Sequence, residues 1–243
     1  MKRLVLGGLM AGLAFVGSAH AETAGVAVAA NFTAVAEQLA EAFKVETGHE
    51  LTLSFGATGQ LYTQVTQGAP FDVFLSADDE RPTRAVEEGF GVEGTVFTYA
   101  IGALALYSTA LDVSNGEEAL KGDFSHIAIA DPETAPYGRA AIETLTALGL
   151  YDGLSARVVT GENITQTLQF VESGNAELGF VAASQVVGKS SQWLVPEELH
   201  EPIRQDAVLL THGETNEAAK AFIDYLKSPA ATAVIEAAGY VVE

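Results

Sequence analysis

The chain has 243 residues, of which 12 are Lys or Arg and 32 are Asp or Glu, so its formal net charge is −20. This excess of negative charge argues against a nucleic-acid-binding protein, because such binding depends on basic side chains that neutralise phosphates. Hydrophobic residues make up 48% of the chain and cysteine is absent, which allows substantial cores in one large domain or two small ones and excludes disulfide bonds.

The first 21 residues have the pattern of a secretory signal peptide. Lys2 and Arg3 precede an apolar run from Leu4 to Val16, and small residues then lead to Ala21. A buried helix or a membrane anchor is the alternative, but the run is too short to span a bilayer comfortably. We therefore expect a periplasmic protein, with residues 1–21 removed by cleavage after Ala21, whose acidity serves solubility.

The first half of the mature chain predicts alternating strands and helices. Phe32, Val35, Leu39 and Phe43 recur at spacings of three and four, so they share one face of a helix, and Gly48 ends that helix. This order of elements is typical of a mostly parallel sheet with helices on both faces. The other expected elements are strands at 25–29, 50–55 and 71–76 and helices at 60–66 and 82–88.

The same pattern returns after a long apolar segment at 97–107, and a second extended segment follows at 207–211. These two segments predict two hinge crossings between two lobes. We thus expect an α/β fold in which lobe 1 comprises 22–100 and 204–243, lobe 2 comprises 101–203, and the ligand cleft lies between them. The remaining expected elements are strands at 126–130, 157–160 and 178–181 and helices at 138–148, 164–172, 214–226 and 229–238.

Four junctions between a strand and the next helix are candidate binding loops: 29–33 and 56–59 in lobe 1, and 131–138 and 161–165 in lobe 2. A helix N-terminus carries unpaired N–H donors and a partial positive charge. Each junction alone is more often ordinary capping than a ligand site. None of their expected inner positions is Lys or Arg, so together they predict a seat for an anion held by neutral donors.

A lining made only of donors also selects among anions. A fully ionised oxyanion only accepts hydrogen bonds, whereas hydrogen phosphate carries a proton that needs an acceptor. Asp131 and Glu162 lie near the junctions and would weaken this selection if they turned inward.

Several segments resemble one known family: "AANFTAVAEQLAEAF" at 29–43, "FGATGQLYTQVTQGAPFDVFLSAD" at 55–78, "DPETAPYGRAAIETLTALGL" at 131–150, "GNAELGFV" at 174–181 and "FIDYLKSPAATAVIEAAGY" at 222–240. On these residues, essentially the whole mature chain resembles the periplasmic molybdate-binding proteins of ABC importers. The resemblance implies a type II periplasmic-binding-protein fold that captures molybdate or tungstate. It also implies delivery to an inner-membrane permease with a cytoplasmic ATPase, a monomer, no cofactor, and molybdenum present only as the bound oxyanion.

The resemblance also implies the residues that surround the oxyanion. Asn31 and Thr58 correspond to the positions that donate from side chain and backbone. Tyr137 and Ile164 correspond to positions that donate from the backbone. Ala30 and Gly59 are neighbours of second rank.

Two positions depart from the commonest pattern of the family. Many members have Ser where Asn31 stands, and many have Tyr where this chain has Ala182, which has no hydroxyl to donate. The chain resembles the subgroup with Asn at the first site and Tyr in the "APYG" turn, so Tyr137 is a candidate to fill part of the space left at Ala182.

Two other classes of function stay open at this stage. The same scaffold could bind sulfate, phosphate, iron or an organic solute, because fold does not fix ligand. An exported hydrolase is the second alternative, but the sequence contains neither an H-E-x-x-H nor a G-x-S-x-G pattern and has no cysteine nucleophile. We therefore expect a binding protein rather than an enzyme.

Overall fold

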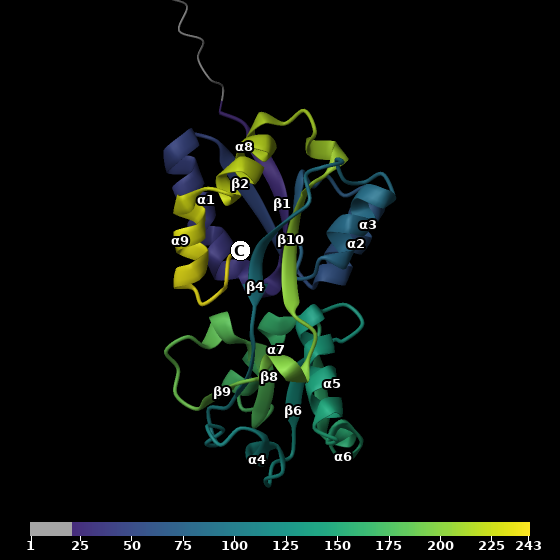
Figure 1. Ribbon diagram of the computed structural model, residues 1–243, viewed down its shortest axis with the longest axis vertical. Coiled ribbons are helices and arrows are strands. Elements are labelled where there is room, and N and C mark those ends of the chain that lie inside the picture. The colour runs from purple at the N-terminus through teal and green to yellow at the C-terminus, as the bar shows by residue number, and fades with distance from the viewer. Residues whose placement is uncertain (1–20) are drawn as a thin grey trace, which may run out of the picture.

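The computed structural model describes residues 21–243, so the expected signal peptide lies outside the described residues except for Ala21. Two sheets, each covered by helices, form two lobes stacked along the long axis of the molecule (Figure 1). The expected two-lobed α/β fold is confirmed. Within the described residues, no helix has the length and apolar character needed to cross a membrane.

The sheet of lobe 1 has the strand order β2-β1-β3-β10-β4. Strand β1 pairs in parallel with β2 and β3, whereas β10 pairs antiparallel with both β3 and β4. The sheet is therefore mixed rather than mostly parallel. Its strands are β1 (Thr23–Ala29), β2 (Glu50–Gly56), β3 (Val73–Leu75), β4 (Phe97–Gly102) and β10 (Ile203–Leu209).

Helices cover both faces of this sheet because successive strand residues point to opposite sides. Val26 and Val28 pack with Phe43 and Phe222 from the helices on one face, and Ala27 packs with Leu61 from the other. Figure 1 shows α1, α8 and α9 on one side and α2 and α3 on the other. These helices are α1 (Thr33–Thr47), α2 (Thr58–Thr66), α3 (Glu80–Glu87), α8 (Glu217–Leu226) and α9 (Pro229–Ala237), with short turns η1 (Ala30–Phe32) and η5 (Thr211–Gly213).

The sheet of lobe 2 repeats the plan with the order β7-β6-β8-β5-β9. Strand β6 is parallel to β7 and β8, and β5 is antiparallel to β8 and β9. Its strands are β5 (Leu104–Tyr107), β6 (Ile127–Ala130), β7 (Val158–Gly161), β8 (Leu178–Ala182) and β9 (Gln192–Leu194). Its helices are α4 (Glu117–Leu120), α5 (Pro136–Ala147), α6 (Tyr151–Leu154), α7 (Ile164–Glu172), η2 (Ser155–Arg157), η3 (Ala183–Val186) and η4 (Glu197–Leu199).

The chain crosses between lobes twice. The expected single segment at 97–107 is two strands in different sheets, because β4 ends at Gly102 and β5 begins at Leu104. The second crossing begins earlier than expected, since β10 starts at Ile203. Strand β9 and the one-turn helices α4 and α6 were not predicted, because such short elements leave too few residues to show a period.

Candidate functional site

The two junctions of lobe 1 place Asn31 and Thr58 at helix starts. Asn31 lies in η1 directly after β1, and Thr58 is the first residue of α2, separated from the end of β2 by Ala57. No side chain caps either helix end, so the first-turn N–H groups are not used by a cap. Asn31 and Thr58 are only 5% and 1% exposed, which removes them from bulk solvent.

The two junctions of lobe 2 place Tyr137 and Ile164 in equivalent positions. Tyr137 is the second residue of α5, and Ile164 is the first residue of α7. The Asn163 side chain caps α7 by accepting from the N–H groups of Thr165 at 3.0 Å and Gln166 at 3.1 Å. The N–H of Ile164 lies outside that cap, which leaves a backbone donor at a buried helix start.

Contacts between the lobes bring these junctions together. The Thr165 hydroxyl donates to the Ala30 carbonyl at 3.1 Å, and the Gly59 N–H donates to the Thr134 carbonyl at 2.8 Å. One apolar cluster contains residues from all four junctions: Ala30, Ala57, Tyr137 and Ile164. The structure therefore holds the lobes closed, with the four helix starts meeting at the interface. The N–H of Gly59 is used by the lobe contact.

A buried polar network that the sequence did not reveal lies behind Asn31 and Tyr137. Gln205 of β10 is 0% exposed and accepts from Asn31 Nδ2 at 2.8 Å and from the Tyr99 hydroxyl at 3.2 Å. Its Nε2 donates to the Tyr137 hydroxyl at 3.3 Å. Tyr240 accepts from Asn31 Nδ2 at 3.0 Å and from the Ser184 hydroxyl of lobe 2 at 2.9 Å.

This network limits what Asn31 can offer a ligand. Both amide hydrogens of its side chain are used, one by Gln205 and one by Tyr240. The backbone N–H in the first turn of η1 is the remaining donor of this residue. Thr58 is different, because its hydroxyl oxygen accepts from the Ala77 N–H at 3.1 Å and so keeps its own hydrogen for donation.

The tyrosines of the network stay neutral donors. Burial raises the pKa of Tyr99 and of Tyr137 well above the ordinary value of 10.0, and burial also raises the pKa of Tyr240. A neutral phenol can donate to an anion, whereas a phenolate would repel it. The centre of the interface therefore offers neutral hydrogen-bond donors at neutral pH.

Charged side chains lie around this centre, and Arg81 and Arg139 among them lie against carboxylates. Asp78 is 3% exposed and forms an ion pair with Arg81, whose Nη2 also donates to the Glu133 carbonyl at 3.3 Å. The side chain of Arg139 is half-exposed, and its Nη1 lies 3.7 Å from Glu80 Oε2. Asp131 accepts from the Glu133 N–H at 3.0 Å, and Glu162 is exposed.

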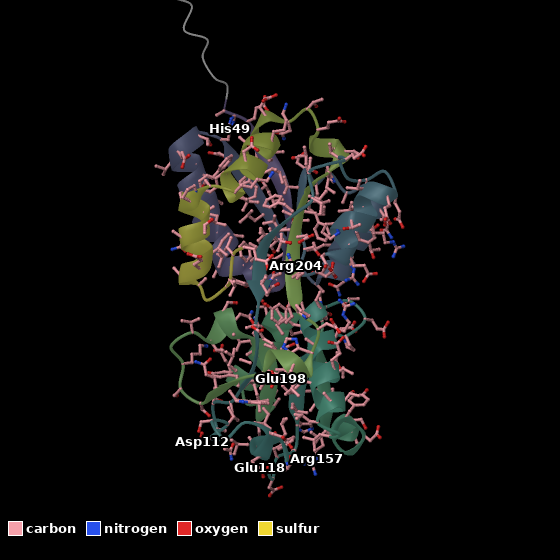
Figure 2. The ribbon with its side chains drawn as sticks, viewed as in Figure 1. His49, Asp112, Glu118, Arg157, Glu198 and Arg204 are labelled. Carbon is pink, nitrogen blue, oxygen red and sulfur yellow. The ribbon has the colours of Figure 1, made fainter. Side chains whose placement is uncertain are left out.

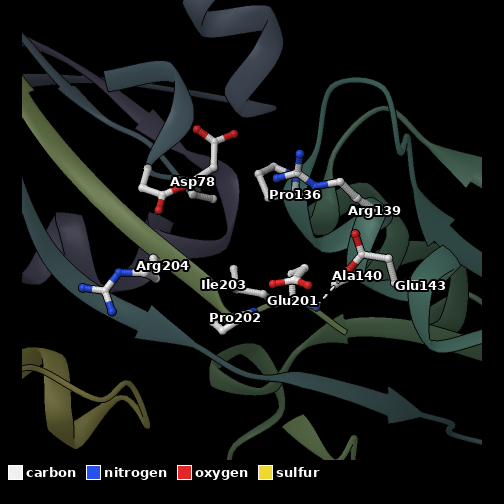
Figure 3. Close-up of a pocket in the computed structure, with 11 residues that line it drawn as sticks. Asp78, Pro136, Arg139, Ala140, Glu143, Glu201, Pro202, Ile203 and Arg204 are labelled. Carbon is white, nitrogen blue, oxygen red and sulfur yellow. Dashed lines mark hydrogen bonds between the residues drawn. The ribbon is translucent and has the colours of Figure 1, made fainter. Parts of the chain in front are cut away.

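A small charged cavity of about 30 Å³ lies beside the crossing strands (Figure 3). Asp78, Arg139, Glu143 and Arg204 line it, and the dashed line in Figure 3 is the bond from the Glu201 N–H to Glu143 at 3.0 Å. This volume holds a water molecule but not a solute the size of an oxyanion with its shell. The cavity is therefore not the ligand site.

Several other titratable groups lie far from the interface. Figure 2 shows His49 at the outer end of lobe 1 and Asp112, Glu118 and Arg157 at the outer end of lobe 2. In residues 21–243, no group of three or more His, Cys, Asp or Glu side chains could hold a metal ion. These positions do not form a catalytic or metal centre with the buried junctions.

Comparison with known proteins identifies the family to which this chain belongs. A model of the bacterial extracellular solute-binding protein family matches residues 24–241. The molybdate-binding protein ModA of Rhodobacter capsulatus is 53% identical over 89% of this chain and 87% of its own. The protein of the same name from Azotobacter vinelandii is 50% identical over 99% of this chain and 97% of its own. The chain belongs to the ModA family of solute-binding proteins.

Solved structures of ModA-type proteins share the fold. The periplasmic molybdate-binding protein of Azotobacter vinelandii superimposes with a TM-score of 0.86 at 41% identity, over 90% of this chain and 99% of that one. The substrate-binding domain of a putative molybdenum ABC transporter from Clostridium difficile superimposes with a TM-score of 0.69 at 30% identity, over 92% of this chain and 100% of that one. The predicted family resemblance is confirmed, and this ModA-family chain is a binding protein rather than an enzyme.

Proposed function

We propose that this ModA-family chain captures molybdate, and tungstate as its closest analogue, and delivers the oxyanion to an ABC transporter. The observation that carries this proposal is the meeting of neutral helix starts from both lobes, at Asn31, Thr58, Tyr137 and Ile164. Relatives at 53% and 50% identity carry the name molybdate-binding protein, which supports molybdate as the ligand.

The proposed contacts follow from the donors that the structure leaves available. Thr58 donates from its hydroxyl and its N–H. Asn31, Tyr137 and Ile164 donate from the backbone, and Ala30 lies beside them at the first junction. Fixed, desolvated N–H and O–H donors hold a dianion without a cationic side chain, because they need no reorganisation when the ligand enters. Molybdenum is thus present only inside the bound oxyanion.

Binding is coupled to lobe closure in this proposal. We propose bounds of 22–100 with 204–243 for lobe 1 and 101–203 for lobe 2. The crossings from β4 to β5 and from η4 to β10 act as the hinge, with the last residues of β4 and the first of β10 still paired in the sheet of lobe 1. A ligand shifts the equilibrium toward the closed form only through contacts that are absent in the open form. Donors from both lobes provide such contacts.

The setting of this function is the periplasm. The N-terminal signal peptide is cleaved after Ala21, and the mature chain acts as a monomer. The partner is an inner-membrane permease with a cytoplasmic ATPase, because this chain has no G-x-x-x-x-G-K-[ST] phosphate-binding loop of its own. No nucleic acid and no resident cofactor take part.

A thermal-shift panel on the mature chain tests this proposal. A ligand that binds only the folded protein raises its melting temperature by linkage, about 2.7 kcal/mol of stabilisation at 100 times the dissociation constant. We expect molybdate and tungstate to raise the melting temperature strongly and sulfate and phosphate to do so weakly. A response to phosphate or iron alone, or to no oxyanion, would contradict the proposal.

A further inference from the structure

Gln205 is a buried polar residue whose side chain contacts the ligand junctions of both lobes. It lies on β10, the strand that enters lobe 1 from the second crossing. Its side chain contacts Asn31 of lobe 1 and Tyr137 of lobe 2, and it is 0% exposed. Because the bond to Tyr137 passes between lobes, it requires the closed arrangement.

The hydrogens in this network have a defined direction. Gln205 Oε1 accepts from Asn31 at 2.8 Å and from the Tyr99 hydroxyl at 3.2 Å, which shares its one hydrogen with the Ser76 carbonyl at 3.0 Å. Gln205 Nε2 donates to the Tyr137 oxygen. A hydroxyl that accepts in this way keeps its own hydrogen for another acceptor. The hydrogen of the Tyr137 hydroxyl has Tyr240 as a partner, since a hydrogen bond between these two side chains helps to raise the pKa of Tyr137, and Gln205 therefore fixes Tyr137 in place at the start of α5.

Gly102 provides a second, independent indication that this contact is built into the fold. A Cβ at Gly102 of β4 would lie 2.1 Å from the Tyr137 hydroxyl and 2.7 Å from Gln205 Nε2. Real Cβ atoms do not approach other atoms that closely. The first crossing strand thus leaves room for Tyr137 and Gln205 to meet only because this residue has no side chain.

The surroundings of Gln205 are uncharged. The titratable groups that face it are the hydroxyls of Tyr99 from β4 and Tyr137 from α5, with Tyr240 next in the network. The nearest carboxylates that influence these tyrosines are Asp78 and Asp206. The neutral Gln205 amide therefore lies among neutral hydrogen-bonding groups. A negative charge at position 205 would have no cationic side chain in direct contact.

We propose that Gln205 is a positioning residue for oxyanion binding, which holds Asn31 and Tyr137 in place so that the backbone N–H groups of these two residues face the bound anion. This inference rests on the proposed function. Gln205 acts through Asn31 and Tyr137 and does not itself touch the anion. Because the Gln205 side chain contacts both lobes, it also couples ligand binding to the position of β10, the second crossing strand.

The variant Gln205→Glu tests this role with nearly unchanged shape. Its carboxylate still accepts from Asn31 and Tyr99 but cannot donate to the Tyr137 hydroxyl, so the hydrogen bond that fixes Tyr137 is lost in the charged form. When protonated, the same side chain can donate again. Burial and the nearby dianion both favour the protonated form, so anion binding becomes coupled to proton uptake.

We expect Gln205→Glu to bind molybdate on the order of a hundredfold more weakly than wild type at pH 8.5, because a buried charge without a partner opposes the anion. Its affinity should rise by up to about tenfold for each pH unit on lowering the pH toward 6, as linkage of one proton requires. Wild type, titrated in parallel, corrects for the ligand's own protonation. The exposed Gln38→Glu on α1 is the matched control and should follow wild type.

Wild-type affinity in Gln205→Glu at pH 8.5 would overturn the inference, as would a loss that does not change with pH. If this variant does not fold, Gly102→Ala tests the same contact without a charge and should weaken binding at least tenfold. Wild-type affinity in folded Gly102→Ala would also overturn it. Failure of wild type to bind any oxyanion would instead contradict the proposed function, so the two failures are distinguishable.

Discussion

The N–H of Gly59 and the carbonyl of Thr134 lie 2.8 Å apart and join the start of α2 in lobe 1 to the loop before α5 in lobe 2. This bond links the two lobes beside the site. A Cβ at Gly59 would lie 3.1 Å from the Thr134 Cα and 3.1 Å from Arg81 Nη2. A side chain at residue 59 would therefore require Thr134 or Arg81 to shift by a few tenths of an ångström in the closed form.

The substitution Gly59→Ala should weaken molybdate binding by about 1–3 kcal/mol, because overpacking at a tight contact costs that much. The cost falls on the closed form, so the melting temperature of the ligand-free protein should change little. Titration calorimetry measures the affinity. Gly153→Ala is the control, since a Cβ there meets nothing within 4 Å, and an equal loss in both variants would contradict the prediction.

Thr58→Ala should weaken molybdate binding by about 1–3 kcal/mol, which is typical for the loss of a hydrogen bond to a charged group. The hydroxyl also accepts from the Ala77 N–H, so some loss of stability accompanies the loss of affinity. Thr58→Ser keeps the hydroxyl and should stay close to wild type. If the Ser and Ala variants bind equally well, Thr58 does not donate to the ligand from its side chain.

Thr165→Val removes the hydroxyl that donates to the Ala30 carbonyl between the lobes. We expect the closed form to lose about 0.5–1.5 kcal/mol, as for one neutral hydrogen bond. Stopped-flow measurement of tungstate or molybdate release should show faster dissociation. Thr66→Val, whose hydroxyl bonds only within α2, is the control. Unchanged release in Thr165→Val would show that this bond does not hold the lobes together.

The buried tyrosines predict a loss of stability in alkali. Burial and then the hydrogen bond to Glu88 raise the pKa of Tyr62 from 10.0 to about 12. In the unfolded chain a tyrosine hydroxyl titrates at about pH 10. The stability that neutral Tyr62 contributes to the folded protein is therefore fully present below about pH 10 and is lost as the pH rises toward about 12. Urea unfolding between pH 9 and 11.5 should show the decline. Tyr62→Phe should reduce its slope, whereas exposed Tyr151→Phe should not.

The sequence predicted the parts of the fold that repeat a period. The stripe of Phe32, Val35, Leu39 and Phe43 defined α1, and Gly48 ends it in a left-handed conformation with φ of 79°. The junctions were predicted as well, because a strand that is followed by a capping residue and a helix has a local sequence signature. The split of 97–107 into two strands was missed, because both strands are apolar and only their partners differ.

The buried network could not be predicted from local sequence. Gln205 and Tyr240 are distant along the chain from Asn31, and their contacts depend on how β10 and the C-terminal segment return to lobe 1. The expected extended segment at 207–211 left Gln205 outside it, so no sequence signal pointed to this residue. Without these partners, the Asn31 side chain was expected to donate to the ligand, whereas the structure uses both of its amide hydrogens for the network.

The crystal structure of the mature chain with molybdate tests the central claim most directly, that neutral donors from both lobes hold the oxyanion. We predict the anion between the lobes, within about 2.7–3.2 Å of donors from Asn31, Thr58, Tyr137 and Ile164, with no Lys or Arg in contact. Molybdate bound elsewhere, or held by a cationic side chain such as Arg81 or Arg139, would contradict the account.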